Sequence, residues 1–273
     1  MKNNPLVTAL KGMVVGGTML VPGVSGGSMA IILGIYDRLI SSVSSFMKHK
    51  RKSFLFLMTF ALGGGLGMFF FAKPLMGLIE RYPMPMLYFF LGAVAGSIPL
   101  ILRQAEVKKF TWSVPGYILL GVLVLFLLSL LPTGAFDTEI KAGAMSFLLL
   151  TAAGLIAAVA LVLPGISVSY LLLLMGLYDE TMRAIGEFYF PFLIPLGIGL
   201  LLGIILTTKI LERVMLNYPQ PTYLVILGFM IGSMTEVYPG FPQGWECLLC
   251  FGAMSVGFLG IYFLSKGEKN TVS

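Results

Sequence analysis

The stretch "LVPGVSGGSMAIILGIYDRL" at residues 20–39 interrupts a strongly apolar segment with a proline, glycines and serines. A second stretch at residues 161–181, "LVLPGISVSYLLLLMGLYDET", interrupts another apolar segment in nearly the same way. Proline removes a backbone donor and stops a helix, and glycine weakens one. The two stretches therefore predict two broken helical segments at matching places in the chain.

The composition around these breaks is that of a membrane protein. The chain has 273 residues, of which 58% are hydrophobic and 11% charged, and its mean hydropathy is +0.95. A soluble domain would carry about a quarter charged residues. Continuous apolar segments, each close to the length that crosses a bilayer, lie at about 54–72, 86–102, 114–131, 190–208, 222–238 and 246–265. The sequence therefore predicts an all-α polytopic membrane protein.

The two interrupted regions, at about 12–46 and 142–186, do not fit a single crossing. A continuous helix of about 35 residues would be ~52 Å long, well beyond a hydrocarbon core of ~30 Å. Split at the proline-glycine pair, each region gives two arms that are short for two full spans. We therefore predict a re-entrant or broken helical hairpin in each region, surrounded by protein or water that satisfies the freed backbone groups.

The breaks belong to an internal repeat. At an offset of 142, six residues of the first region match six of the second: Pro22, Gly23, Ser25, Gly34, Tyr36 and Asp37 match Pro164, Gly165, Ser167, Gly176, Tyr178 and Asp179. At an offset of 136, "YPMP" at 82–85 matches "YPQP" at 218–221. We therefore predict one transmembrane domain of two repeats, 1–135 and 136–273. One hairpin plus three spans in each half gives an odd number of crossings, so the repeats are expected to be inverted, as in many transporters.

The basic residues predict the orientation. If the first hairpin opens to the cytoplasm, fourteen of the eighteen Lys and Arg lie on the cytoplasmic side, including the run "KHKRK" at 48–52. The opposite orientation would place those fourteen outside, against the positive-inside rule. We therefore expect both termini in the cytoplasm. The formal charge of +6 is then explained by membrane topology and indicates no nucleic-acid partner.

The first break is the strongest candidate site. After Pro22-Gly23 a helix can begin near Ser25, which is a favourable N-cap residue. Its first amide groups are free, and Gly26 and Gly27 would let a ligand approach the backbone. Together with the Ser25 and Ser28 hydroxyls, these groups suit a phosphate or carboxylate. The alternative is a structural kink satisfied by neighbouring helices.

The second break offers a mirror version. Ser167 and Ser169 follow Pro164-Gly165, but Val168 stands where the first break has a glycine. We expect this copy to be less open to a ligand.

Four basic residues could assist such a site. Lys73 and Lys209 occupy equivalent places at span ends, where snorkelling to the headgroups is the simpler explanation and guidance of a phosphate the alternative. Arg38 and Arg183 follow the two hairpins and could serve the two mouths of a pathway.

Three acidic residues are weaker candidates for coupling. Asp37 and Asp179 could close the hairpins or carry a proton, and Glu236 lies near a span end. No cofactor or metal is predicted, because Cys247 and Cys250 have no accompanying ligands and are interpreted as small apolar residues.

Glycines four residues apart recur in both halves. Such pairs let helices pack closely in lipid, and we assign them to packing. The pairs are Gly63/Gly67, Gly92/Gly96, Gly199/Gly203 and Gly228/Gly232.

The segments "PGVSGGSMAIILGIYDRL" and "LPGISVSYLLLLMGLYDE" resemble the bacterial PopT-type polyprenyl-phosphate transporters, formerly a membrane domain of unknown function. The resemblance extends over essentially the whole chain. It implies a multi-pass protein of the bacterial cytoplasmic membrane that returns undecaprenyl phosphate from the outer to the inner leaflet. The lipid then carries cell-envelope precursors again. The motif residues that the resemblance carries over are Pro22, Gly23, Ser25, Gly26, Gly27, Ser28, Pro164, Gly165 and Ser167.

Other functions remain open at this point. An undecaprenyl-pyrophosphate phosphatase would need grouped acidic residues and an arginine beside the serine, which the motif lacks. A transporter of another small anion, coupled to H+ or Na+, is a further alternative. A scaffold without transport would not require polar breaks within the bilayer. The coupling ion, the prenyl chain length and the oligomeric state are not indicated by the sequence.

Overall fold

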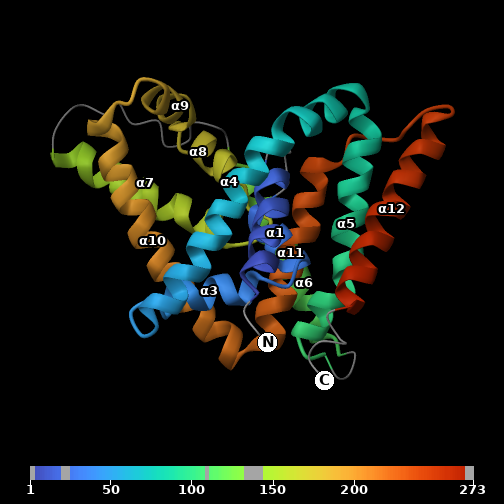
Figure 1. Cartoon of the computed structure of the whole chain (residues 1–273), viewed down its shortest axis with the longest axis horizontal. Helices are drawn as coiled ribbons and strands as arrows, with labels where there is room; N and C mark the ends of the chain where they lie inside the picture. Colours follow the sequence, from blue (N-terminus) through green and yellow to red (C-terminus); the bar gives the residue numbers. More distant parts are fainter. Residues whose placement is uncertain (1–3, 20–24, 108–110, 132–143, 268–273) are drawn as a thin grey trace.

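A computed structural model describes residues 4–19, 25–107, 111–131 and 144–267, and every regular element in these residues is a helix (Figure 1). The helices of the first half are α1 (Pro5–Thr18), α2 (Gly26–Ile32), α3 (Tyr36–Ser44), α4 (Lys50–Arg81), α5 (Pro83–Gln104) and α6 (Ser113–Ser129). Those of the second half are α7 (Ala144–Val162), α8 (Val168–Leu174), α9 (Tyr178–Gly186), α10 (Phe190–Asn217), α11 (Pro219–Val237) and α12 (Glu246–Gly267).

Five of these helices are long and apolar enough to cross a membrane. The stretches that meet this requirement are Lys50–Phe71, Pro83–Gln104, Met145–Val162, Phe190–Asn217 and Glu246–Phe263. The prediction of a polytopic helical membrane protein is confirmed.

The helices pack in four long pairs. Within each half, α1 packs on α4 and α7 packs on α10. Between the halves, α5 packs on α12 and α6 packs on α11. The last helix of each half is therefore held by the other half.

The predicted glycine pairs form these four seams. A Cβ added at Gly67 would lie 1.9 Å from the Met13 carbonyl oxygen, and one at Gly199 would lie 2.0 Å from that of Thr151. At Gly92 it would lie 2.1 Å from the carbonyl oxygen of Met254. Any side chain there would force the helix axes apart, so the assignment of these pairs to packing is confirmed.

The interrupted regions differ from the predicted two-armed hairpins, because each contains a second break. Gly34 and Gly176 have φ angles of 60° and 69°, a backbone conformation that glycine adopts readily. The Ile35 amide donates to the Ala30 carbonyl at 2.9 Å, and the Gly34 amide donates to Ile31 at 2.8 Å. This pair of bonds is the Schellman motif that ends a helix. Each region is therefore three helices, with a helix of seven residues in the middle.

Three helices are longer than the sequence predicted. One is α10, whose 28 residues extend to Asn217 although the predicted segment ends at about 208. α7 has 19 residues and is long enough to cross a membrane, so it is not a short hairpin arm. Residues 144–163 contain no proline that would end this helix before Pro164. α4 has 32 residues and continues through Pro74 to Arg81, well past the expected end near residue 72.

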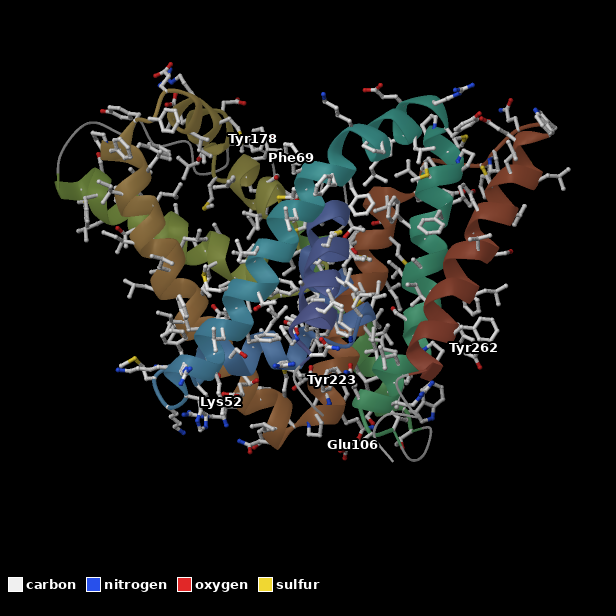
Figure 2. The ribbon with its side chains drawn as sticks, viewed as in Figure 1. Lys52, Phe69, Glu106, Tyr178, Tyr223 and Tyr262 are labelled. Carbon is white, nitrogen blue, oxygen red and sulfur yellow. The ribbon has the colours of Figure 1, made fainter. Side chains whose placement is uncertain are left out.

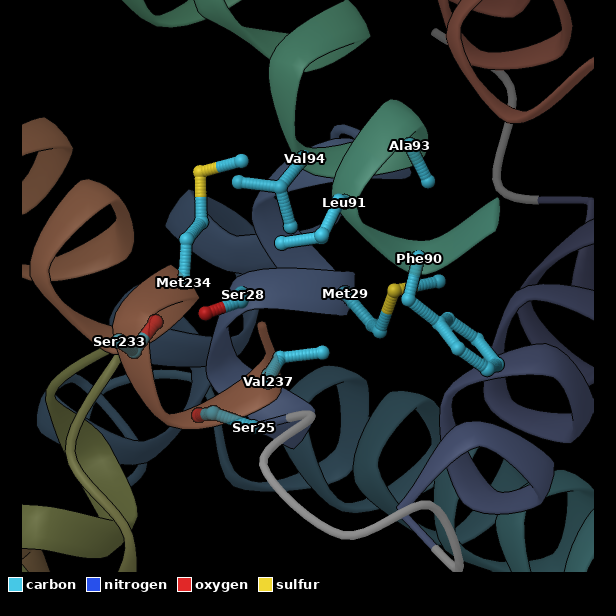
Figure 3. Close-up of a pocket in the computed structure, with 10 residues that line it drawn as sticks. All are labelled: Ser25, Ser28, Met29, Phe90, Leu91, Ala93, Val94, Ser233, Met234 and Val237. Atoms are coloured by element: carbon cyan, nitrogen blue, oxygen red, sulfur yellow. The ribbon is translucent and has the colours of Figure 1, made fainter. Parts of the chain in front are cut away.

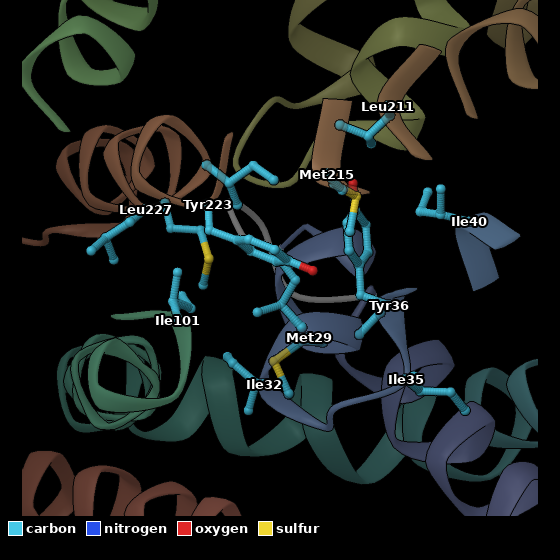
Figure 4. Close-up of a cluster of buried hydrophobic side chains, with 14 of the residues drawn as sticks. Met29, Ile32, Ile35, Tyr36, Ile40, Ile101, Leu211, Met215, Tyr223 and Leu227 are labelled. Atoms are coloured by element: carbon cyan, nitrogen blue, oxygen red, sulfur yellow. The ribbon is translucent and has the colours of Figure 1, made fainter. Parts of the chain in front are cut away.

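The first region is deeply embedded in the protein. Ile31 of α2 is 0% exposed and packs in one cluster with Ile101 of α5 and Met230 of α11. Figure 4 shows Met29 and Tyr36 of the same region grouped with Tyr223 of α11. The short helix α2 is therefore held by burial on several sides.

Candidate functional site

The two breaks meet inside the protein. A Cβ added at Gly27, at the start of α2, would lie 3.2 Å from the Pro164 Cα and 3.5 Å from its Cβ. The space beside Gly27 is therefore taken by the second break, and not left open for a ligand as the sequence suggested. We call the two contacting segments, residues 25–28 and 164–167, the tips.

The second tip is also fixed against α11. Gly165 has a φ of 84°, and a Cβ there would lie 2.6 Å from the backbone carbon and oxygen of Phe229. A glycine is needed here both for its backbone conformation and for the close approach of another helix.

A buried hydrogen bond joins the two broken regions. The Tyr36 hydroxyl, at the start of α3, donates to the Val162 carbonyl at the end of α7 over 2.8 Å. Tyr36 is 3% exposed. The sequence marked Tyr36 as a repeat-matched residue but gave no sign of this partner, which lies 126 residues away.

We expect Tyr36→Phe to destabilise the protein, because it leaves a buried carbonyl without a donor. Such a loss costs about 1–3 kcal/mol. Thermal unfolding of the purified protein in detergent measures the effect. Tyr178→Phe removes the same hydroxyl at the half-buried equivalent position and is the matched control. Equal stability of the two variants would contradict the importance of the Tyr36 bond.

A small pocket lies beside the first tip (Figure 3). Its polar side chains are Ser25 and Ser28 of the first tip and Ser233 of α11, and the hydroxyls of Ser28 and Ser233 point toward one another in the figure. The remaining lining is apolar: Met29, Phe90, Leu91, Ala93, Val94, Met234 and Val237. The cavity has a volume of about 20 Å³, which is enough for about one water molecule.

Ser25 occupies the predicted N-cap of α2, and its side chain makes no capping hydrogen bond. Ser28 is 5% exposed. Ser233 was not predicted as a site residue, and its hydroxyl donates to the Met230 carbonyl at 2.9 Å. At the repeat offset of 136, Ser233 matches Ser97, and this match is the signal in the sequence that could have pointed to it. The structure therefore brings two of the predicted site residues, Ser25 and Ser28, to one pocket with Ser233.

The second tip is not a copy of the first. The Ser167 hydroxyl caps α8 by accepting from the Tyr170 amide at 3.3 Å. Ser169 is exposed. At the position equivalent to Ser28 stands Tyr170, whose hydroxyl donates to the Leu128 carbonyl at 3.1 Å. The Ser167 hydroxyl is thus used to cap α8, and the Tyr170 hydroxyl is used to bond α8 to the end of α6.

The predicted basic residues do not line the serine pocket. Lys73 and Lys209 are exposed on α4 and α10. Arg183 is paired with Glu180 on α9. Arg38 lies over the ring of Phe56, with 4.0 Å from its guanidinium carbon to the ring centroid.

Two of the acidic candidates, Asp37 and Asp179, do not line this pocket either. Asp37 and Asp179 are exposed in the first turns of α3 and α9, where the helix dipole stabilises a negative charge. Asp37 is hydrogen-bonded to Tyr223 and lies 3.5 Å from the Gln104 amide nitrogen. Pro22 and Gly23 lie outside the described residues, as does the side chain of Glu236.

Comparison with known proteins identifies the family. Residues 15–246 match the sequence model of the VCA0040-like family, described as undecaprenyl phosphate translocase-like. The chain belongs to this family. A polyprenyl-phosphate transporter of Vibrio cholerae is 32% identical over 254 residues, which cover 86% of this chain and 78% of the relative. One of Staphylococcus aureus is 33% identical over 264 residues and 93% of both chains. No solved structure matches.

Family membership agrees with the resemblance drawn from the two breaks. The matched range contains both tips and the serine pocket beside the first of them. The two relatives are named as transporters of a polyprenyl phosphate, which is a lipid with a phosphate headgroup.

Proposed function

We propose that the protein moves undecaprenyl phosphate from the outer to the inner leaflet of the bacterial cytoplasmic membrane. The lipid then serves again as a carrier in cell-envelope synthesis. The observation that carries this proposal is the contact between Gly27 and Pro164 beside a serine-lined pocket, in a chain of the undecaprenyl phosphate translocase-like family.

The architecture that we propose is a single transmembrane domain of two inverted repeats, 1–135 and 136–273. Three observations support it. The two halves have the same order of six helices, α1 packs on α4 as α7 packs on α10, and the pairs α5–α12 and α6–α11 exchange partners between halves. In Figure 1, α3 and its counterpart α9 lie at opposite ends of the molecule. With the basic run at 48–52 in the cytoplasm, both termini are cytoplasmic.

The polar tips would act on the phosphate alone, because the prenyl tail can stay in lipid throughout. The pocket beside Ser28 has room for about one water molecule, so a headgroup requires the first tip to move away from α5 and α11, which form the rest of the lining. We propose that this movement also separates the two tips. We propose that separation at one end or the other exposes Ser25, Ser28 and Ser167 to each leaflet in turn. Lys73, Lys209 and Arg183 would attract the headgroup at the membrane surfaces.

The transport step is proposed to involve no bond cleavage. None of the ten residues that line the serine pocket is charged. Hydrolysis of a diphosphate requires charged groups or a metal ion to stabilise the leaving phosphate. Among the side chains that the structure describes, the lining offers hydroxyl donors and no charge, which suits transient binding and release of a phosphate.

A gradient of H+ or Na+ is our proposal for the driving force. Asp37, Asp179 and Glu236 are the candidate coupling residues. The proposal rests on their carboxyl groups and on the position of the first two in the repeat-matched turns after the short helices.

The experiment that tests the function measures headgroup accessibility of undecaprenyl phosphate on both faces of proteoliposomes. We expect native protein to exchange the lipid between leaflets under a gradient of one of the two ions. The Ser25→Ala/Ser167→Ala variant is expected to exchange it at least about tenfold more slowly, which corresponds to ~1.4 kcal/mol in the barrier.

Ser255→Ala is the matched control, because Ser255 is an exposed serine of α12 whose hydroxyl bonds only within its own helix, to Phe251. No exchange by the native protein under either gradient would exclude the proposed function. Unchanged exchange by the double variant would exclude the tips as its site.

A further inference from the structure

A second, larger pocket lies at the end of the molecule that carries the basic run. It is lined by α3, the turn that follows and the first two turns of α4. The lining residues are Arg38, Ser41, Ser42, Ser45, His49, Lys52, Ser53 and Phe56. Its volume, measured as for the serine pocket, is about 340 Å³, within the range of pockets that hold a small ligand. Figure 2 marks its position by Lys52, at the end opposite Tyr178.

The lining of this basic pocket is suited to an anion. Three of its side chains are basic, four are serines, and none is a carboxylate. The stacking of Arg38 on Phe56 restricts the guanidinium, while its N–H donors at the edge of the plane remain usable. Phe56 itself is 6% exposed and forms a rigid base for that contact.

Two carboxylates on or beside α3 are engaged with other residues. Glu212 of α10 accepts a hydrogen bond from Ser44, which is not part of the lining. Asp37 is bonded to Tyr223 on α11. The positive charge of the pocket is therefore not neutralised by a carboxylate among its own lining residues.

The equivalent place in the second half has a different charge pattern. At the repeat offset, Arg38 corresponds to Glu180 and Ser41 corresponds to Arg183. These two residues form an ion pair with each other, at 2.5 Å. The basic run after α3 has no counterpart after α9, where the chain reads "EFYF" at 187–190. The arrangement of Arg38, His49 and Lys52 is therefore specific to one end.

We propose that the basic pocket binds the phosphate monoester headgroup of the transported lipid at the cytoplasmic surface, after the headgroup leaves the tips. This inference rests on the proposed function. The shared chemistry is a phosphate dianion, which could belong to a lipid or to free phosphate. Phe54, Leu55 and Met58 are exposed apolar residues on the same turns of α4, and they provide a surface for a prenyl chain. A lipid is therefore the better fit.

The pocket has a defined physical role in transport. A site that binds the headgroup at one end supplies no driving force, because only a gradient can shift the final distribution. It stabilises the headgroup in the cytoplasmic leaflet and favours its release from the tips toward that side. Arg and Lys together with serine hydroxyls give charge-assisted hydrogen bonds to the phosphate oxygens.

Binding of farnesyl phosphate to the purified full-length protein in detergent tests the pocket directly, without any transport. We expect Arg38→Ala/Lys52→Ala to weaken this binding at least about tenfold. The matched control is Lys50→Ala/Arg51→Ala, which removes the same charge from the same basic run at residues that do not line the pocket, and it should change binding less than about twofold. Lys52→Ala alone, at an exposed position, provides a variant whose folding is not in question.

The other probes separate the possible ligands. Farnesol, which has no phosphate, is expected to bind equally to all variants, and inorganic phosphate is expected to bind much more weakly than farnesyl phosphate. Equal loss in both double variants would show only a diffuse surface charge and would overturn the pocket. Inorganic phosphate binding as tightly as farnesyl phosphate would overturn the lipid assignment.

Failure of this inference can be told from failure of the proposed function. Unchanged farnesyl phosphate binding in Arg38→Ala/Lys52→Ala, with normal leaflet exchange by native protein, refutes only the pocket. Absence of exchange by native protein refutes the transport function, whatever the binding result.

Discussion

Oxidation of the Gly27→Cys/Pro164→Cys variant is expected to stop leaflet exchange of undecaprenyl phosphate, and reduction is expected to restore it. The Cβ positions at residues 27 and 164 are 3.5 Å apart, at the short end of the range that a disulfide spans. A covalent bond between the tips would tie α2 to the second tip, which itself lies against α11 at Phe229. The pocket between α2 and α11 would then keep its present size, which excludes a headgroup. Exchange should therefore fall to the rate of protein-free vesicles.

The variant is best built in a protein without Cys247 and Cys250, which are free cysteines. Each single cysteine variant, oxidised in the same way, controls for the effect of the substitutions themselves. The reduced double variant gives the reference rate in the same preparation. Exchange that continues at that rate after complete oxidation would mean that the tips need not separate, and the alternating exposure proposed here would be wrong.

Gly165→Ala is expected to have the largest effect of any single substitution considered. The φ of 84° at Gly165 disfavours alanine, and the added Cβ would lie 2.6 Å from the Phe229 backbone. Because α11 packs on both α6 and α5, its backbone cannot easily move away. Backbone strain and steric overlap together should cost roughly 3 kcal/mol or more.

Thermal unfolding in detergent measures this loss, and leaflet exchange in proteoliposomes should fall with it. The matched control is Gly186→Ala, where an added Cβ meets nothing within 4 Å and alanine favours the helix. A Gly165→Ala protein as stable as Gly186→Ala would contradict the close contact between the second tip and α11.

Features that depend on local chemistry were predictable from the sequence. Ser25 and Ser167 were expected to begin helices, since serine satisfies a free amide at a helix start, and they occupy the N-cap positions of α2 and α8. The glycine pairs were expected at helix contacts because small residues permit close approach in lipid, and they lie in all four seams.

The second break in each region was signalled but not recognised. Gly34 and Gly176 were matched in the repeat, and a glycine after an apolar helical run is a common helix end. The length of the apolar run hid this signal, because "SMAIILGIYD" contains no proline or charged residue before Asp37.

Features that depend on distant contacts were not predictable. The approach of Gly27 to Pro164, the Tyr36–Val162 bond and the contribution of Ser233 to the pocket all join residues more than 100 positions apart. A single sequence does not indicate which distant residues come into contact. The basic run at 48–52 was assigned to topology alone. That two of its residues, His49 and Lys52, line a pocket follows from the turn between α3 and α4.

The pairing of α6 with α11 has a consequence for biosynthesis. An added Cβ at Gly121 of α6 would lie 2.3 Å from the Val225 carbonyl oxygen, so the groove at Gly121 fits one particular partner. That partner begins at Pro219, long after α6 ends at Ser129. During translation, the ribosome therefore delivers α6 to the bilayer well before the helix that covers it. Until then the groove faces lipid or the insertion machinery, and the nascent first half cannot mature without the second.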